Sequence, residues 1–131
     1  MRITRINPDT LHKNPAFTQV ATVSGPATLV FVGGQNGVTA DGQVAGKDIA
    51  SQSAQTYKNV LAALEAAGAT LEDVFKMTIY IVQGHSVQEG YSAILRVQTQ
   101  HVPPPTISVI IVAGLANPDY LVEIEAAAAI D

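Results

Sequence analysis

The chain has 131 residues, a length that suits one domain with a single core over residues 1–131, and its lack of cysteine excludes disulfides, thiolate metal ligands and a cysteine nucleophile. The net charge is −4 and the seven lysines and arginines are scattered, so nucleic acid is a poor candidate partner, because phosphate binding needs clustered positive charge. No run of about 18 apolar residues is present, so we expect no membrane-spanning helix and no membrane partner.

The first half of the chain predicts three strands and one long helix. Apolar and β-branched runs, bounded by Asn-Pro, Gly-Pro and Gly-Gly turns, predict strands over residues 3–6, 19–24 and 28–34. Apolar residues at helical spacing predict a helix from Asp48, a suitable N-cap, to Ala67, with Gly68 as its stop signal.

The second half predicts three more strands and a second helix. The strands are expected over residues 73–83, 107–112 and 121–128, and the helix over 86–100, where three consecutive prolines stop it. Two helices can cover only one face of a sheet of about six strands. We therefore predict an α+β fold with a mixed, mostly antiparallel sheet of about six strands and two helices on one face.

The low charge content predicts self-association. Only 14% of the residues are charged, well below the roughly 25% that is typical of soluble domains. A small monomer with so little charge would leave apolar surface in water, so we expect a homo-oligomer. The N-terminal residues lack the apolar segment of a signal peptide, and we expect a cytoplasmic protein.

Several segments together resemble one protein family. They are Phe31-Val32-Gly33-Gly34-Gln35, Glu65-Ala66-Ala67-Gly68, Val74 to Tyr80, Pro105-Thr106, Ala113-Gly114-Leu115 and Val122-Glu123-Ile124-Glu125-Ala126. In this combination the chain resembles the reactive intermediate deaminase family, also called the Rid or YjgF-like superfamily, over nearly its whole length. The resemblance implies a chorismate-mutase-like α+β fold and a homotrimer. In such trimers the sheets face a central barrel and a small-molecule pocket lies at each subunit interface.

The resemblance also implies a chemistry. The best-known members hydrolyse 2-imino and enamine acids to 2-keto acids and ammonia without a cofactor, and others carry an endoribonuclease label. Glu123 matches the carboxylate that positions or activates water, which suits a reaction that delivers water to carbon and a proton to nitrogen. The alternative for Glu123 is a structural acid, satisfied by backbone N–H groups or by water. We expect no cofactor and no metal, since the three histidines lack metal-binding spacing.

One position departs from the pattern of the active members. The arginine that holds the substrate carboxylate aligns with Ile107, and isoleucine cannot replace the two parallel hydrogen bonds of a guanidinium group. Leaving a charged ligand group unpaired in a pocket costs about 2–5 kcal/mol. The substitution therefore predicts a changed substrate preference or a loss of activity.

Other positions of the implied pocket are partly kept. Phe17 stands where active members have tyrosine, Gly33 where they have serine or threonine, and Gln88 where they have asparagine, so polar groups are lost. The implied substrate-binding residues are Phe17, Gly33, Gly34, Gln35, Gln88, Ile107, Ser108 and Val109, the last through its backbone N–H group. We expect a pocket that keeps its acid and suits a smaller or less charged ligand than an imino acid.

Three functions stay open at this point. The first is hydrolytic deamination of a reactive imine, enamine or related small metabolite, with an altered substrate preference. The second is a non-catalytic trimer that binds or senses a small metabolite in the same pocket. The third, an endoribonuclease, has little support because the chain is acidic and shows no basic groove.

Overall fold

The computed structural model describes residues 1–131 and contains six strands and two α-helices. In chain order the elements are β1 (Arg2–Ile6), β2 (Val20–Ser24), β3 (Thr28–Gln35), α1 (Ile49–Ala66), the short 3₁₀ helix η1 (Leu71–Asp73), β4 (Val74–Val82), α2 (Val87–Val97), β5 (Thr106–Val112) and β6 (Val122–Ile130). The predicted α+β class, the six strands and the two helices are confirmed. Neither helix is long and apolar enough to cross a membrane.

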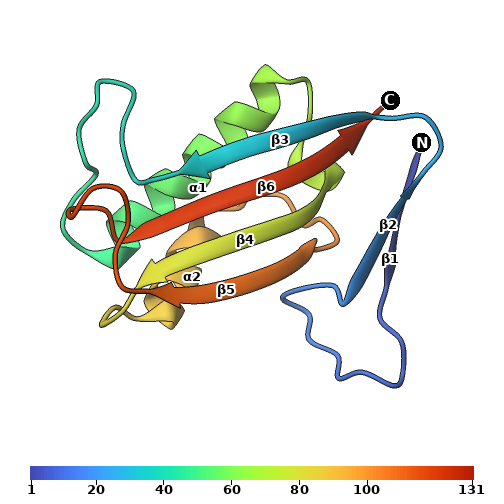
Figure 1. Cartoon of the computed structure of the whole chain (residues 1–131), viewed down its shortest axis with the longest axis horizontal. Coiled ribbons are helices and arrows are strands. Elements are labelled where there is room, and N and C mark those ends of the chain that lie inside the picture. Colours follow the sequence, from blue (N-terminus) through green and yellow to red (C-terminus); the bar gives the residue numbers. More distant parts are fainter.

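The strands form two sheets, which Figure 1 shows side by side. The larger sheet has the order β3-β6-β4-β5, in which β6 runs antiparallel to both β3 and β4, and β5 runs parallel to β4. Strands β1 and β2 form a separate antiparallel pair at one end of the larger sheet (Figure 1). The mixed, mostly antiparallel pairing agrees with the sequence prediction.

The division into two sheets differs from the single sheet expected from the sequence. The five residues of β2 pair along their whole length with β1, whereas the eight residues of β3 pair with the nine-residue β6. A longer partner satisfies more of the backbone groups of β3. Gly25 lies between β2 and β3 with φ of 86°, a conformation that glycine adopts without strain, and it redirects the chain from one sheet to the other.

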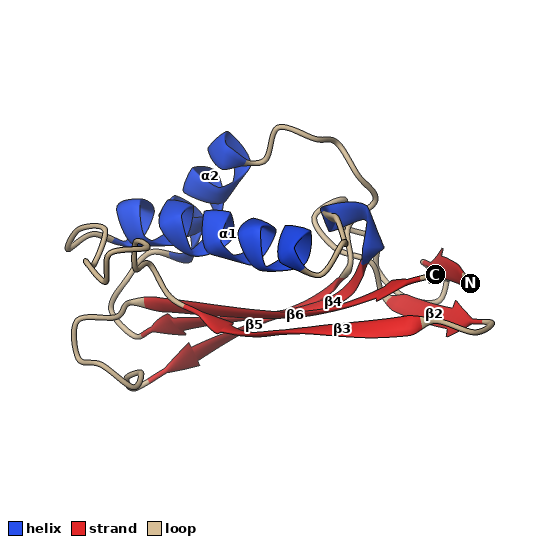
Figure 2. Ribbon diagram, turned by 90° about the horizontal axis from the view of Figure 1, so that it is seen from above, coloured by secondary structure: helices blue, strands red, loops and turns tan.

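Both helices pack on one face of the larger sheet, as Figure 2 shows. The core lies between the helices and the sheet, where Val60 and Leu64 of α1 and Ile124 of β6 are fully buried. No element covers the opposite face of the larger sheet (Figure 2). On that face the side chain of Phe31 is 75% exposed, although it belongs to a strand.

The helix ends follow local chemistry. The side chain of Asp48 accepts a hydrogen bond from the backbone N–H of Ser51 at 2.9 Å, which caps α1 as predicted, and this bond lowers the pKa of Asp48. Gly68 ends the helix with φ of 76°. Helix α2 ends at Val97, earlier than predicted, because the backbone becomes extended at Gln98 and runs as a loop to the prolines.

Candidate functional site

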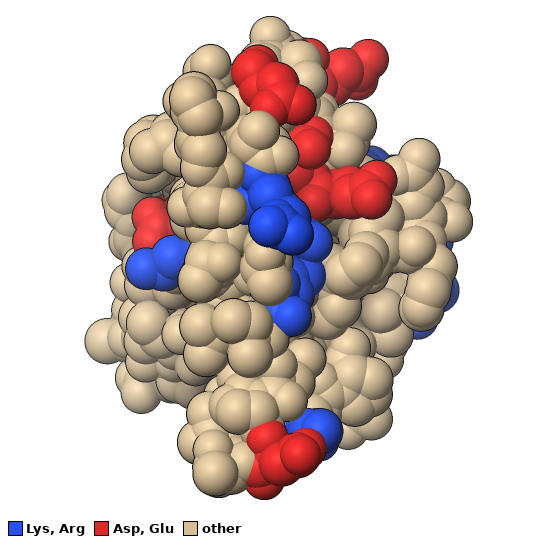
Figure 3. Space-filling model, turned by 90° about the vertical axis from the view of Figure 1, so that its right-hand side faces the viewer, with Lys and Arg blue, Asp and Glu red and all other residues tan.

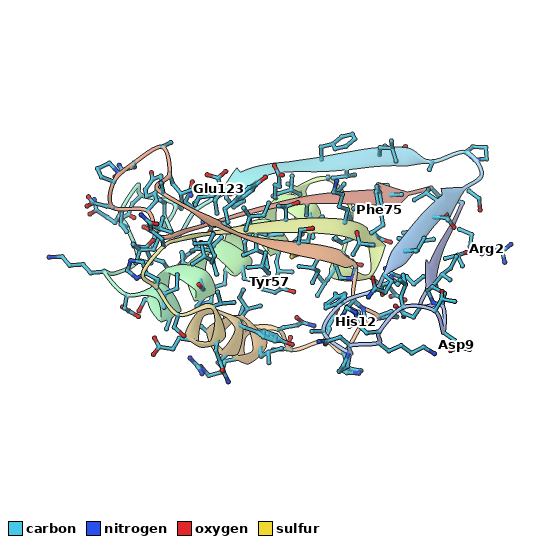
Figure 4. All side chains as sticks on the ribbon, turned by 60° about the horizontal axis from the view of Figure 1, so that its bottom comes forward. Arg2, Asp9, His12, Tyr57, Phe75 and Glu123 are labelled. Carbon is cyan, nitrogen blue, oxygen red and sulfur yellow. The ribbon has the colours of Figure 1, made fainter.

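Glu123 lies near the start of β6, on the face of the sheet that no helix covers (Figure 4). Its neighbours Val122 and Ile124 point to the opposite side, into the core, as the alternation of a strand requires. The Glu123 side chain is half-buried, and its Oε1 accepts a hydrogen bond from Asn36 Nδ2 at 3.2 Å. The same Nδ2 donates to the carbonyl oxygen of Val122 at 3.0 Å, so the asparagine fixes both the strand and its carboxylate.

Gly34 makes room for that carboxylate. Strands β3 and β6 lose their regular register between Val32 and Gln35, so Gly33 and Gly34 form a bulge beside Glu123. A Cβ atom at Gly34 would lie 2.5 Å from Glu123 Oε2, whereas a Cβ atom at Gly33 would meet nothing within 4 Å. The amide of Gln35 donates to the Gly33 carbonyl at 3.1 Å, so it is engaged with its own strand.

Helix α1 supports the loop that carries Asn36. Asn59 Nδ2 donates to the backbone carbonyls of Asn36 and Val38 at 2.9 and 2.7 Å, and Gln55 donates to Asn59 Oδ1 at 2.9 Å. Asn36 and Asn59 therefore orient Glu123, and sequence reasoning missed both. A usable signal was present, because Gln52, Gln55 and Asn59 form a row of amide side chains at helical spacing along α1.

A second carboxylate lies next along the same face. In the strand register Tyr80 is opposite Glu123, yet its hydroxyl donates to Glu125 Oε1 at 2.9 Å. This hydrogen bond, with desolvation and the charges of Glu125 and then Glu123, raises the pKa of Tyr80. Glu125 is therefore hydrogen-bonded to the Tyr80 hydroxyl, whereas Glu123 is hydrogen-bonded to Asn36.

Ile107 lines a hollow on the other side of the sheet. The hollow has a volume of about 710 Å³ and lies between α2, strands β4 and β5, and the loop after α2. Phe17 and Val109 line it as well, so the structure brings together three of the residues named from the sequence. Gln88 is exposed at the start of α2, beside Val87, which lines the hollow.

The lining of this hollow carries no Asp, Glu, Lys or Arg side chain. It consists of Pro15, Ala16, Phe17, Ser53, Tyr57, Leu71, Met77, Ile79, Ile81, Val87, Gly90, Tyr91, Ile94, Leu95, Gln98, His101, Val102, Pro103, Pro104, Pro105, Ile107, Val109 and Val122. Tyr57 lies at its inner wall, between α1 and the sheet (Figure 4), and donates to Gln98 Oε1 at 3.1 Å. Burial raises the pKa of Tyr57 to about 12.

The acid and the hollow are on opposite faces of the sheet. Ile107 pairs with Met77, which pairs with Ala126, and these three share the helix-covered face, whereas Glu123 points away from it. Ser108, the next residue of β5, points to the same face as Glu123. Within one chain, therefore, Glu123, Gly34 and Ser108 belong to one face, and Ile107, Val109 and Phe17 belong to the other.

Comparisons with known proteins agree with this fold. The family model described as Endoribonuclease L-PSP matches residues 11–130. The crystal structure of YyfB from Yersinia pestis, of the conserved Rid protein family, is 30% identical with a TM-score of 0.86, over 99% of this chain and 100% of that chain. Escherichia coli TdcF with bound serine is 29% identical with a TM-score of 0.71, over 83% of this chain and 91% of that chain.

A shorter match is found with a RutC family protein of Pyrococcus abyssi, which is 40% identical over 54 residues. That match covers 40% of this chain and 42% of the length of the relative. The family model covers most of the chain and the structural match with YyfB extends over nearly all of it. The chain therefore belongs to the endoribonuclease L-PSP family, to which the Rid proteins belong.

Proposed function

We propose that this protein hydrolyses a reactive imine or enamine, and that its active sites lie between the subunits of a cytoplasmic homotrimer. The observation that carries the proposal is the oriented carboxylate of Glu123, held by Asn36 and given room by Gly34. Because Gly34 has no Cβ, the carboxylate packs against the backbone of β3, and Gly34 and Asn36 together hold it in one position, as a proton-transferring group requires.

The location of Glu123 and of the hollow on opposite faces of the sheet supports a site that is shared between copies of the chain. Glu123 on one face cannot reach a ligand held by Ile107 on the other face of the same sheet. A second copy, placed with its hollow next to the Glu123 of the first, would complete a site of acid and apolar wall. The exposed apolar side chains of Leu29, Phe31 and Ile110 on the uncovered face favour such assembly.

The proposed chemistry needs one carboxylate and one water. Glu123 accepts a proton from water while the water oxygen bonds to the imine carbon, and the proton passes to nitrogen. Glu123 then carries the hydroxyl proton of this tetrahedral adduct to the nitrogen as the carbon–nitrogen bond breaks, so ammonia leaves and a carbonyl group remains. An enamine reacts in the same way once a proton has been added to its carbon.

Ile107 determines which substrate fits the proposed site. If it replaces a carboxylate-binding arginine, a substrate with a carboxylate loses its partner, at a cost of about 2–5 kcal/mol. The same substitution favours the second candidate, a non-catalytic trimer that binds a small metabolite. The serine bound to TdcF shows that this relative binds a small molecule.

Endoribonuclease activity, despite the name of the family model, has no comparable support. The net charge is −4, and Figure 3 shows at one end of the molecule a narrow streak of lysine and arginine side chains, with acidic side chains beside its upper part and other basic groups apart from it. A phosphate backbone needs a wider positive surface.

Ammonia release tests the proposal. Wild-type protein and Glu123→Gln are each mixed with freshly generated 2-iminobutyrate, 3-aminoacrylate and an uncharged imine of similar size. The proposal expects release with at least one substrate and its loss in Glu123→Gln, because an amide cannot accept the proton. Equal, flat traces for both proteins on all substrates would favour the binding protein instead.

Position 107 is tested separately with Ile107→Arg. We expect this substitution to create or raise hydrolysis of 2-iminobutyrate, because a guanidinium group pairs with its carboxylate. A variant that stays folded, trimeric and inactive on this substrate would show that the interpretation of Ile107 is wrong.

A further inference from the structure

The hollow beneath α2 combines a buried floor with an exposed rim. Met77 and Val122, at the floor, are 4% and 1% exposed and belong to the core of the sheet. Tyr91, Leu95 and Val109, at the rim, are each more than two-fifths exposed. A concave site with a buried apolar floor and solvent-exposed apolar side chains at its rim is typical of a preformed binding site.

The chemistry of the lining defines what can enter. Fifteen of its 23 residues are hydrophobic, and none is an acid, a lysine or an arginine. The side chain of Gln98 already accepts from Tyr57 and donates to the carbonyl of Gln100, so its polar atoms are engaged. An anion entering this hollow would lose its hydration and find no fixed cation in return, which is unfavourable.

We propose that the hollow binds a small, uncharged, mainly apolar molecule, and that the substrate of this protein is an imine that lacks a carboxylate. The imine part rests on the proposed function, whereas the preference for an uncharged ligand rests on the hollow alone. Its volume of about 710 Å³ lies within the roughly 300–1,000 Å³ of small-molecule sites. An aromatic or branched aliphatic group fits against Ile107 and Val109.

Two ligands of similar shape, one anionic and one uncharged and apolar, test the proposal by binding. Phenylpyruvate carries a carboxylate, and 3-methyl-1-phenylbutan-2-one has an isopropyl group of similar shape in its place. The chain has two methionines, of which Met77 lines the hollow and Met1 is the N-terminal residue, so methyl-labelled methionine gives one reporter and one internal control. Titrations followed by NMR therefore give the affinity and the location together.

The expected result is a shift of the Met77 methyl signal with the ketone, no shift at Met1, and binding at least ten-fold tighter than that of phenylpyruvate. Equal or tighter binding of phenylpyruvate would overturn the proposal. A ketone that leaves Met77 unchanged, or shifts Met1 equally, would overturn it as well. Neither ligand is turned over, so a protein that binds the ketone but releases no ammonia refutes only the proposed hydrolysis.

A charge placed in the hollow should reverse the preference. In Ile107→Arg, phenylpyruvate should bind at least ten-fold tighter than it does to the wild-type protein. Ala62→Arg is the control, because the same charge at an exposed position of α1 outside the hollow should leave both affinities as they were. An equal gain for phenylpyruvate in Ala62→Arg and in Ile107→Arg would show that the added charge acts without the hollow, and the wild-type comparison decides the proposal even if a variant fails to fold.

Discussion

Gly34→Ala should disable the proposed active site without unfolding the protein. A methyl group at residue 34 would lie 2.5 Å from Glu123 Oε2 and 2.7 Å from its Cδ, and ordinary contact begins at 3.4 Å. The carboxylate must therefore move by about 1 Å, and a displacement of this size near the chemistry costs roughly 100-fold in rate. Because the atoms in the way end a flexible side chain, the loss of stability should stay near 1 kcal/mol, the cost of an unfavourable rotamer.

Gly33→Ala is the matched control for this experiment. The neighbouring glycine belongs to the same bulge, neither glycine has a positive φ, and a methyl group at residue 33 meets nothing within 4 Å. Imine hydrolysis is followed by ammonia release, and unfolding by urea titration. An equal loss of rate in both variants, or a Gly34→Ala variant with wild-type rate, would refute the assigned role of Glu123 and Gly34.

Two further predictions concern stability. Gln52 is fully buried, and its side chain donates to the carbonyls of Gly46 and Asp119 and accepts from the N–H of Leu121. Gln52→Ala leaves these groups unpaired and should lower the free energy of unfolding by about 3 kcal/mol, measured by urea titration, whereas a cost below about 1 kcal/mol would show that water replaces the amide. The pKa of Tyr57 is raised to about 12 from its ordinary 10, so the folded state keeps the phenol proton more tightly than the unfolded state. This contribution is fully present below pH 10 and is lost as the pH rises to 12, by about 2 kcal/mol, and Tyr57→Phe should flatten this part of the pH profile of stability. A profile with the same slope in Tyr57→Phe would contradict the assignment.

Local sequence patterns predicted most of the elements. Apolar residues at helical spacing between the Asp48 cap and Gly68 predict helix α1. Both ends of the helix in the structure lie within a residue or two of the predicted ends. The position of Glu123 on a solvent-facing side of β6 follows from its alternation with Val122 and Ile124. Such signals are local, so a single sequence contains them.

The remaining features depend on long-range pairing. The structure pairs β2 with β1 and β3 with β6. The sequence does not specify this choice, because a pairing of β2 with β3 would satisfy the apolar patterns as well. The opposite directions of Ile107 and Glu123 depend on the register of two strands with β4. The contact between Asn36 and Glu123 joins residues 87 positions apart, and the loop that carries Asn36 resembles an ordinary turn in the sequence.

Glu123 of one copy is proposed to act on a ligand held in the hollow of another copy, and mixed trimers test this arrangement. Glu123→Gln lacks the acid, and Val109→Trp fills the rim of the hollow, so each variant alone should release no ammonia from an imine that the wild-type protein hydrolyses. Random mixing of equal amounts should restore about a quarter of the wild-type activity, since one site in four combines an intact hollow with an intact acid from the adjacent subunit. A mixture that exchanges subunits and stays as inactive as its parents would show that the acid of one copy and the hollow of another do not form one site.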